Sequence, residues 1–300
     1  MTVTRSSARV ADSVIARLRT QAAALAPCVK TRAARAFLNA VDQLRAPQGR
    51  DAAMYYDCYA ADAETGGLRG RTPLAYLRVV ERLAELGFDD FAGRRVLDFG
   101  YGSIGAPRLL AVCGAEVVGV DADLALDALY RELDDVGRFP PGADAGSVRL
   151  IHGRFPADPA IVESVGSGYD LVLSKNTLKR GYVHPRAQVD GSRRVELGVT
   201  DAEFLSIIRN CLVPGGLFAI YNLSPRSQEP SSAFVPHADG ACPFAAADLE
   251  RAGLEVVLYD VEDDVGMASM ARALGWDRAL GLDPERDIAS TFTVTRRVGR

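Results

Sequence analysis

The chain of 300 residues is 48% hydrophobic and 25% charged, with a formal net charge of −4. This composition predicts a globular protein with a sizeable core, and its acidic balance argues against a nucleic-acid partner, which usually meets a basic face. No apolar run reaches the length of a membrane span, and the start from Met1 to Arg5 lacks the apolar core of a signal peptide. We therefore expect a cytoplasmic protein that binds neither nucleic acid nor membrane.

The spacing of cysteine and histidine gives no sign of a metal site. The five cysteines form no C-x-x-C pair and are odd in number, which favours reduced thiols over a disulfide framework. The three histidines, His152, His184 and His237, show no metal-ligand spacing. We expect no metal, although a magnesium site built from scattered carboxylates stays open.

The first part of the chain predicts helices and no strand. Apolar residues recur at helical spacing over 7–26 and 29–44. A third helix is predicted over 72–86, with Pro73 at the favoured first helical position. We therefore expect residues 1–90 to form a helical N-terminal cap.

From Arg94 onward, predicted strands and helices alternate, which favours a parallel sheet with helices on both faces. Strands are predicted at 94–99, 116–121, 148–152, 169–174, 217–222, 254–260 and 291–297. Helices are predicted at 106–113, 124–136, 201–212, 244–252 and 265–274, and Thr200 and Glu203 form a capping box at the start of the third. Residues 91–300 should thus form one α/β domain with a doubly wound sheet of seven strands.

The first two predicted strands end in a pattern typical of a nucleoside-binding site. The first opens into a turn containing Gly100, Gly102 and Gly105, and the second ends on Asp121. Glycine adopts the positive φ angles of such a turn, and a carboxylate at a strand end can accept hydrogen bonds from both hydroxyls of a ribose. The pattern predicts a nucleoside-containing cofactor across the carboxyl ends of a parallel sheet, with a structural turn that binds no ligand as the alternative.

The choice of cofactor depends on the surroundings of this turn. The spacing is a literal G-x-G-x-x-G, as in an NAD-dependent oxidoreductase. Asp98 argues against NAD, because a buried anion would repel a pyrophosphate and suits a cationic ligand. Further on come the strand 169–174 and the turn Pro214-Gly215-Gly216 before an apolar strand that ends at Tyr221. In this order, the elements over residues 90–300 resemble class I S-adenosylmethionine-dependent methyltransferases.

This resemblance implies a Rossmann-like sheet whose last strand inserts antiparallel beside the fifth. It also implies S-adenosylmethionine as cofactor and direct displacement of its methyl group by a small-molecule oxygen, nitrogen or carboxylate acceptor. The acid that often follows the third strand is absent from the segment His152 to Phe155. The cofactor site implied by the resemblance consists of Asp98, Gly100, Tyr101, Gly102, Gly105, Asp121, Ala122, Gly153, Arg154, Phe155, Ser174, Lys175 and Asn176.

The long connection after the fourth strand carries the best candidates for the acceptor site. Lys179, Arg180 and His184 supply two cations and an imidazole, which suit an anionic substrate and proton removal near neutral pH. We expect His184 to act as the base and Lys179 or Arg180 to orient an anionic group. A solvated basic loop is an equal alternative. Tyr182 of the same loop is a candidate to contact the substrate. Tyr55 and Tyr56, for which packing is the simpler explanation, and His237, for which a surface turn is, are further candidates.

Two other function classes stay open beside the methyltransferase. One is an NAD-dependent oxidoreductase, and the other is a non-catalytic protein that binds S-adenosylmethionine without turnover. A nucleic-acid methyltransferase is disfavoured by the net charge and by the lack of an Asn-Pro-Pro-Tyr-type motif after the fourth strand. We expect a small-molecule substrate, and a homodimer is possible.

Overall fold

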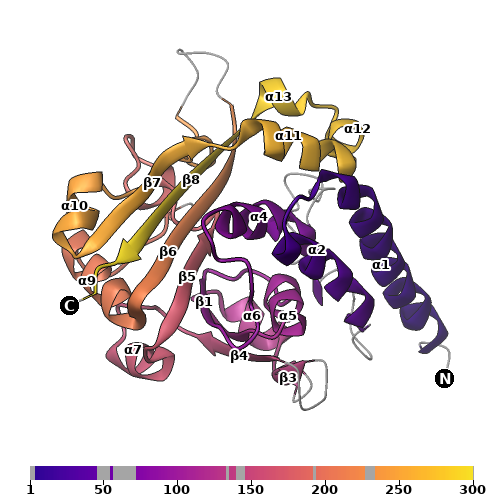
Figure 1. The fold of residues 1–300 in the computed structure, drawn as a ribbon, viewed down its shortest axis with the longest axis horizontal. Helices are drawn as coiled ribbons and strands as arrows, with labels where there is room; N and C mark the ends of the chain where they lie inside the picture. Colours follow the sequence, from indigo (N-terminus) through magenta and orange to yellow (C-terminus); the bar gives the residue numbers. More distant parts are fainter. Residues whose placement is uncertain are drawn as a thin grey trace.

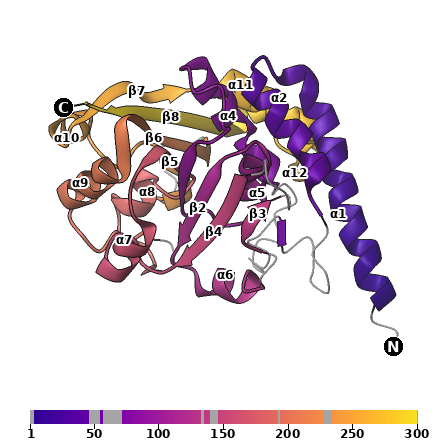
Figure 2. The ribbon, with the colours of Figure 1, turned by 60° about the horizontal axis from the view of Figure 1, so that its bottom comes forward.

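The computed structural model describes residues 4–45, 55–56, 72–132, 135–139, 146–191, 194–226 and 234–299, with the backbone alone for 4–13. These residues form one sheet between two layers of helices (Figure 1). In Figure 2, α1, α2 and α4 lie on one side of the sheet and α7, α9 and α10 on the other. The doubly wound α/β arrangement predicted from the sequence is therefore present.

The sheet has the strand order β3-β4-β2-β1-β5-β6-β8-β7. Its parallel centre consists of β4 (Gly146–His152), β2 (Glu116–Asp121), β1 (Arg95–Phe99), β5 (Tyr169–Lys175) and β6 (Leu212–Pro225). The last strand, β8 (Ile288–Arg297), lies antiparallel between β6 and β7 (Leu254–Glu262). This is the insertion that the methyltransferase resemblance implies.

The sheet has eight strands in the described residues, and the prediction of seven is wrong by one. The additional strand is β3 (Gly137–Phe139), which pairs antiparallel with β4 at the edge. It lies just past the stretch predicted as the helix 124–136, but α6 ends at Leu129. Asp135 accepts a hydrogen bond from the Glu132 backbone N–H at 2.9 Å, and Gly137 has φ +91°. This local side-chain bond and the positive φ favour a turn over continued helix.

The remaining helices flank the parallel strands. Those after β1, β2, β4 and β5 are α5 (Gly105–Val112), α6 (Leu124–Leu129), α7 (Pro159–Val165), α8 (Arg180–Val183) and α9 (Asp201–Cys211). Those near the C-terminus are α10 (Ala246–Arg251), α11 (Asp264–Ala273), α12 (Trp276–Leu280) and α13 (Pro284–Asp287). Both hydrogen bonds of the predicted capping box at Thr200 are present at the start of α9.

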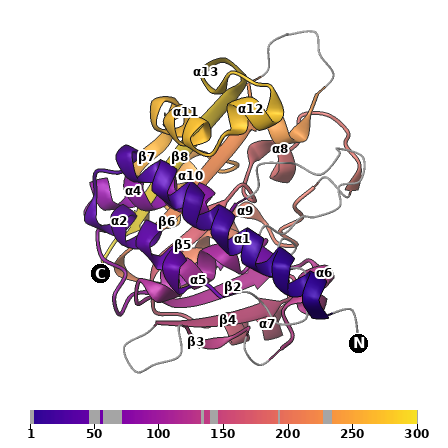
Figure 3. The ribbon, with the colours of Figure 1, turned by 90° about the vertical axis from the view of Figure 1, so that its right-hand side faces the viewer.

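The N-terminal layer packs on one face of the sheet. It contains α1 (Thr4–Leu25), α2 (Arg32–Asn39), the 3-10 turn η4 (Pro73–Tyr76) and α4 (Leu77–Glu85), and Figure 3 shows α1 running diagonally across it. Buried side chains of these helices and of this face of the sheet form one continuous core, whereas a second core lies under α9 and α10. Within the described part of the chain, no helix is long and apolar enough to cross a membrane.

Candidate functional site

The glycine turn closes over the end of β2. Gly100 and Gly102 have φ angles of +71° and +61°, the conformation predicted for them. The Gly102 N–H donates to one carboxylate oxygen of Asp121 at 3.1 Å, and the Asp123 N–H donates to the other at 3.0 Å. Burial raises the pKa of Asp121, while these backbone hydrogen bonds lower it. The Ala122 N–H also bonds to this carboxylate, and because a carboxylate has about four lone-pair sites, Asp121 retains capacity for a ligand hydroxyl.

At two glycines of this turn, neighbouring protein atoms leave no room for a side chain. A Cβ on Gly100 would overlap the side chain of Thr177, which follows β5. A Cβ on Gly105 would lie 2.7 Å from Cβ of Pro73 in the N-terminal layer. The missing side chains therefore let the N-terminal layer and the chain after β5 close on the turn, a role that the sequence pattern does not distinguish from contact with a ligand.

Asp98 is the most deeply buried acid at this edge of the sheet, with no exposed surface. The hydroxyl of Tyr76 lies 3.1 and 3.3 Å from its two carboxylate oxygens. The pKa of Asp98 is raised to about 7, mainly by burial and in part by the charge of Asp121, while the Tyr76 hydrogen bond and the charge of Lys175 act to lower it. Burial also lowers the pKa of the Lys175 ammonium to about 8, against the charge of Asp98.

The sequence interpretation missed Tyr76. Its ring centre lies 5.3 Å from the Lys175 ammonium, so Tyr76 contacts both charged residues expected near the cofactor. No local signal marks it, because it stands within a predicted helix 22 positions before Asp98. Only the folded chain, in which Tyr76 of η4 reaches Asp98 of β1 and Lys175 of β5, brings the phenol to this place.

The residues after β4, predicted to lie near the adenine, contact other protein groups. Nε2 of His152 lies 2.7 Å from the Tyr101 hydroxyl, and its Nδ1 lies 3.2 Å from Asp127 in α6. Arg154 is exposed and forms an ion pair with Glu196 at 3.2 Å. Gly153 has φ +158° with Ile161 beside its Cα. Phe155 is buried in the second core, 6.2 Å from the ring centre of Phe99, and Ala122 is exposed at the end of β2.

The side chains after β5 bond mainly to neighbouring backbone. The Leu178 N–H donates to the buried Ser174 hydroxyl at 3.3 Å. Asn176 has φ +64°, and its side-chain oxygen accepts a hydrogen bond from the Leu223 N–H at 2.6 Å. The ends of β5 and β6 are therefore fastened together beside Lys175.

The structure brings together three of the predicted acceptor-site residues. The buried Lys179 ammonium donates to the carbonyls of Leu223 and His237, the latter at 3.1 Å, and lies 5.5 Å from the Tyr182 ring centre. Burial lowers the pKa of Lys179 to about 7, and the charge of Lys175 adds to this. His237 belongs to the 3-10 turn η6 (Pro236–Ala238).

Arg180 and His184 lie apart from this group. Arg180 is exposed and forms an ion pair with Asp239 at 3.0 Å. His184 is also exposed, and its Nε2 lies 2.9 Å from Asp201 at the start of α9. Each therefore already has an acidic partner.

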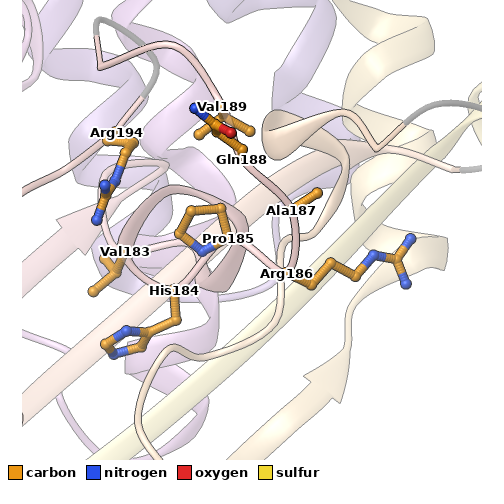
Figure 4. Close-up of a pocket in the computed structure, with 8 residues that line it drawn as sticks. All are labelled: Val183, His184, Pro185, Arg186, Ala187, Gln188, Val189 and Arg194. Atoms are coloured by element: carbon orange, nitrogen blue, oxygen red, sulfur yellow. The ribbon is translucent and has the colours of Figure 1, made fainter.

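A hollow of about 590 Å³ lies beside His184. In Figure 4, the imidazole of His184 and the guanidinium of Arg194 lie on one side of the loop, and Arg186 extends to the other. The residues that line the hollow are Val183, His184, Pro185, Arg186, Ala187, Gln188, Val189 and Arg194. With a histidine, two arginines and no acid in this lining, the hollow suits an anionic group.

Tyr55 and Tyr56 are fully buried. The Tyr55 hydroxyl donates to Asp135 at 2.6 Å, and the Ser103 hydroxyl donates to the Tyr56 carbonyl at 3.1 Å. The Arg108 guanidinium lies 5.0 Å from the Tyr55 ring centre. Both tyrosines thus pack the described part of the 45–71 segment onto the turn. The rest of that segment, 46–54 and 57–71, lies outside the described residues.

No protein-family model matches the chain, and no curated protein matches it. Among solved structures, an S-adenosylmethionine-dependent methyltransferase from Mesorhizobium loti is 16% identical, covering 74% of this chain and 98% of that one, with a TM-score of 0.41. The cyclopropane synthase MmaA2 from Mycobacterium tuberculosis is 14% identical, covering 72% and 85%, with a TM-score of 0.40. Because both TM-scores are low, the fold is assigned from the chain's own strand order, with β8 antiparallel between β6 and β7. The fold is that of the class I methyltransferases.

The donor set at the carboxyl edge of this methyltransferase fold fits the cofactor chemically. Asp98 and Asp121 offer two carboxylates at the ends of the paired strands β1 and β2. The Asp98 carboxylate suits an ammonium group and the Asp121 carboxylate suits the two hydroxyls of a ribose, with the glycine turn between them. Of the described residues, no group of three histidine, cysteine or acidic side chains is arranged to hold a metal ion.

Proposed function

We propose that the protein is an S-adenosylmethionine-dependent methyltransferase acting on a small-molecule acceptor. The observation that carries the proposal is the pair of carboxylates formed by the buried Asp98 and the half-buried Asp121, joined by a turn whose Gly102 N–H bonds to Asp121. A buried anion suits the α-ammonium of the cofactor and opposes the pyrophosphate of NAD. When bound, S-adenosylmethionine supplies an electrophilic methyl group on a sulfonium that leaves as a neutral thioether.

The chain's own contribution to this displacement is mostly positional. Asp98 would hold the ammonium and Asp121 the ribose hydroxyls. Lys175 and Asn176 stand at the end of β5, where the amino-acid part of the cofactor would lie. Tyr101 and Gly105 would complete the turn that supports it.

For the acceptor, His184 remains our candidate base. With Nε2 on Asp201, Nδ1 is the ring nitrogen that would take a proton from an attacking hydroxyl or amine, and the carboxylate would stabilise the resulting cation. Lys179, Arg180 and the arginines of the hollow in Figure 4 would favour an anionic acceptor. We place this chemistry in the cytoplasm, as the sequence predicts.

Calorimetric titration with S-adenosylhomocysteine and with NAD tests the cofactor assignment. Asp121→Asn removes the charge, and Asp158→Asn makes the same change at the N-cap of α7, away from the turn. We expect S-adenosylhomocysteine to bind the wild type and the Asp158 variant, and to bind the Asp121 variant about tenfold more weakly, the scale of one lost charged hydrogen bond. Binding of NAD alone would support an oxidoreductase, and binding of neither would overturn the proposal.

Turnover separates an enzyme from a protein that only binds the cofactor. We expect S-adenosylmethionine to be converted to S-adenosylhomocysteine when small carboxylic acids, phenols or amines are supplied. His184→Ala should slow that conversion when the acceptor has a proton to lose. Binding without conversion for any acceptor of these classes would favour the non-catalytic alternative.

A further inference from the structure

Tyr76 lies where the N-terminal layer meets the candidate cofactor site. It ends the 3-10 turn η4, which begins after Thr72 with the Thr72 hydroxyl accepting from the Leu74 N–H. The Tyr76 side chain is 8% exposed, and its hydroxyl reaches both oxygens of Asp98 at 3.1 and 3.3 Å. The phenol thereby donates its single proton to the carboxylate expected to hold the cofactor ammonium.

The same phenol stands beside the other charge at this place. Its ring centre is 5.3 Å from the Lys175 ammonium, so η4, β1 and β5 each contribute one side chain to the group Tyr76, Asp98 and Lys175. A carboxylate has about four lone-pair sites, and one hydroxyl leaves most of them for a cationic ligand. A hydrogen bond to the charged form also favours the carboxylate over the neutral acid.

We propose that Tyr76 is a positioning residue of the cofactor site, whose hydroxyl orients the Asp98 carboxylate and keeps it ionised for the α-ammonium of the cofactor. This inference rests on the proposed function. It makes the N-terminal layer part of the cofactor site, because a residue of that layer sets the state of an acid in the sheet.

The charges around Asp98 fix the expected pH dependence. The titratable groups that face it are Tyr76 from η4, Asp121 from β2 and Lys175 from β5. Burial raises the pKa of Asp98 to about 7, and the Tyr76 hydrogen bond lowers it, so removing the hydroxyl raises it further. Because the ammonium needs an ionised partner, affinity falls as pH falls through this pKa. In Tyr76→Phe the loss should therefore begin at a higher pH.

The test is calorimetric titration with S-adenosylhomocysteine from about pH 5.5 to about pH 8.5, a range that brackets this pKa. Tyr221→Phe is the matched control, because the buried Tyr221 hydroxyl donates to a carboxylate elsewhere, that of Asp263, at 2.9 Å. We expect Tyr76→Phe to bind about tenfold more weakly near neutral pH, with its pH curve displaced upward. The Tyr221 variant should keep the wild-type curve.

Asp98→Asn completes the experiment, since it should remove the part of the pH dependence that comes from Asp98, namely the loss of affinity as pH falls through about 7. In that background, Tyr76→Phe should cost no further affinity, because additivity fails for residues that act through one another. If the wild type binds S-adenosylhomocysteine and the affinity of Tyr76→Phe changes with pH in the same way as that of the wild type, the role of Tyr76 is overturned. The proposed function is then left intact. Absence of wild-type binding at every pH would overturn both.

Discussion

At the scale of single residues, the candidate cofactor site combines a fully buried acid with ionisable groups that are only partly exposed. Asp98 has no exposed surface and Lys175 lies near it. Burying such groups is costly unless they are paired or change their protonation. The pKa values of both, about 7 and about 8, lie close to neutral pH. We therefore expect the charge of this site to change with pH near neutrality.

Asp98 should contribute measurably to the pH dependence of the free energy of unfolding. Its pKa is about 7 in the folded chain and 3.8 as its ordinary value. Between these values the folded state keeps a proton that the unfolded state has lost, so its contribution to stability is lost as pH rises through this window. We expect the free energy of unfolding of the wild type minus that of Asp98→Asn to fall over the same window. Urea titrations measure this difference, and one that stays constant with pH would contradict the prediction.

Lys179 and Arg180 are adjacent in sequence but differ in burial, and their variants should differ accordingly. Lys179 donates to the carbonyls of Leu223 and His237, whereas Arg180 is exposed and forms an ion pair with Asp239. Lys179→Met leaves two carbonyls without their donor, at about 1–3 kcal/mol for each unsatisfied group. Arg180→Met removes an exposed ion pair, at about 0–1 kcal/mol. Equal losses in urea unfolding would show that the Lys179 contacts are not structural.

How far the site can be predicted depends on whether its contacts are local in sequence. Gly100, Gly102 and Asp121 follow from a short motif, because a turn and the next strand lie together in any parallel pair. The contact of Tyr76 with Asp98 and that of His184 with Asp201 depend on elements packed by the whole fold. The sequence marks His184 as a candidate base, which stays a prediction, but it could not supply the partner Asp201.

At the scale of elements, long periodic segments and explicit caps were predictable. The capping box at Thr200 starts α9 as expected. The short helix α7 was missed, although Asp158 caps it and Pro159 occupies its first position, because seven residues show little periodicity. The edge strand β3 was missed for the same reason. Short elements owe their conformation to their neighbours, and that information is not local.

The N-terminal layer is fastened to the C-terminal part of the sheet by a buried ion pair. Arg78 of α4 donates to both oxygens of Asp263, at 2.8 and 2.6 Å, and the Tyr221 hydroxyl donates to the same acid. Arg78→Ala would leave Asp263 buried without its main counter-charge, which typically costs about 3–5 kcal/mol.

The ion pair of Arg32 is an exposed counterpart to that of Arg78. It pairs with Asp90 at 2.8 Å, but both side chains are largely exposed, so Arg32→Ala should cost about 0–1 kcal/mol. The two variants are compared by their free energies of unfolding in urea. Similar values would mean that the pair between α4 and Asp263 is hydrated and does not hold the layer to the sheet.

At the scale of the whole molecule, the order of strands and helices was predictable and the layering was not. The alternation after Arg94 gave the parallel sheet, and the last strand occupies its implied antiparallel place. The position of residues 1–90 relative to the sheet could not be derived, because nothing in a helical period says what the helix covers. The structure shows that the described side chains of these helices share a core with β1, β2 and β8.

This shared core predicts how the molecule unfolds. Leu18, Phe37 and Leu83 of the N-terminal helices are fully buried in the same cluster as Val96 of β1 and Val294 of β8, so the two parts should lose structure together. The single tryptophan, Trp276 in α12, belongs to that cluster. We expect its fluorescence and far-ultraviolet circular dichroism to report one coincident transition in urea. S-adenosylhomocysteine should move the midpoint of the transition seen by both signals to a higher urea concentration, because a ligand that binds the folded state stabilises it by mass action.

A chain reduced to residues 91–300 should fail the same test. It would expose the apolar face now covered by the N-terminal helices, and it would lose both the Tyr76 hydroxyl on Asp98 and the Arg78 guanidinium on Asp263. We expect this shortened chain to bind hydrophobic dye, to unfold without a cooperative transition, and to lose affinity for S-adenosylhomocysteine. A shortened chain that unfolded cooperatively and bound the cofactor product as tightly as the full chain would show that the helical layer is an accessory, and that Asp98 is ordered by the sheet alone.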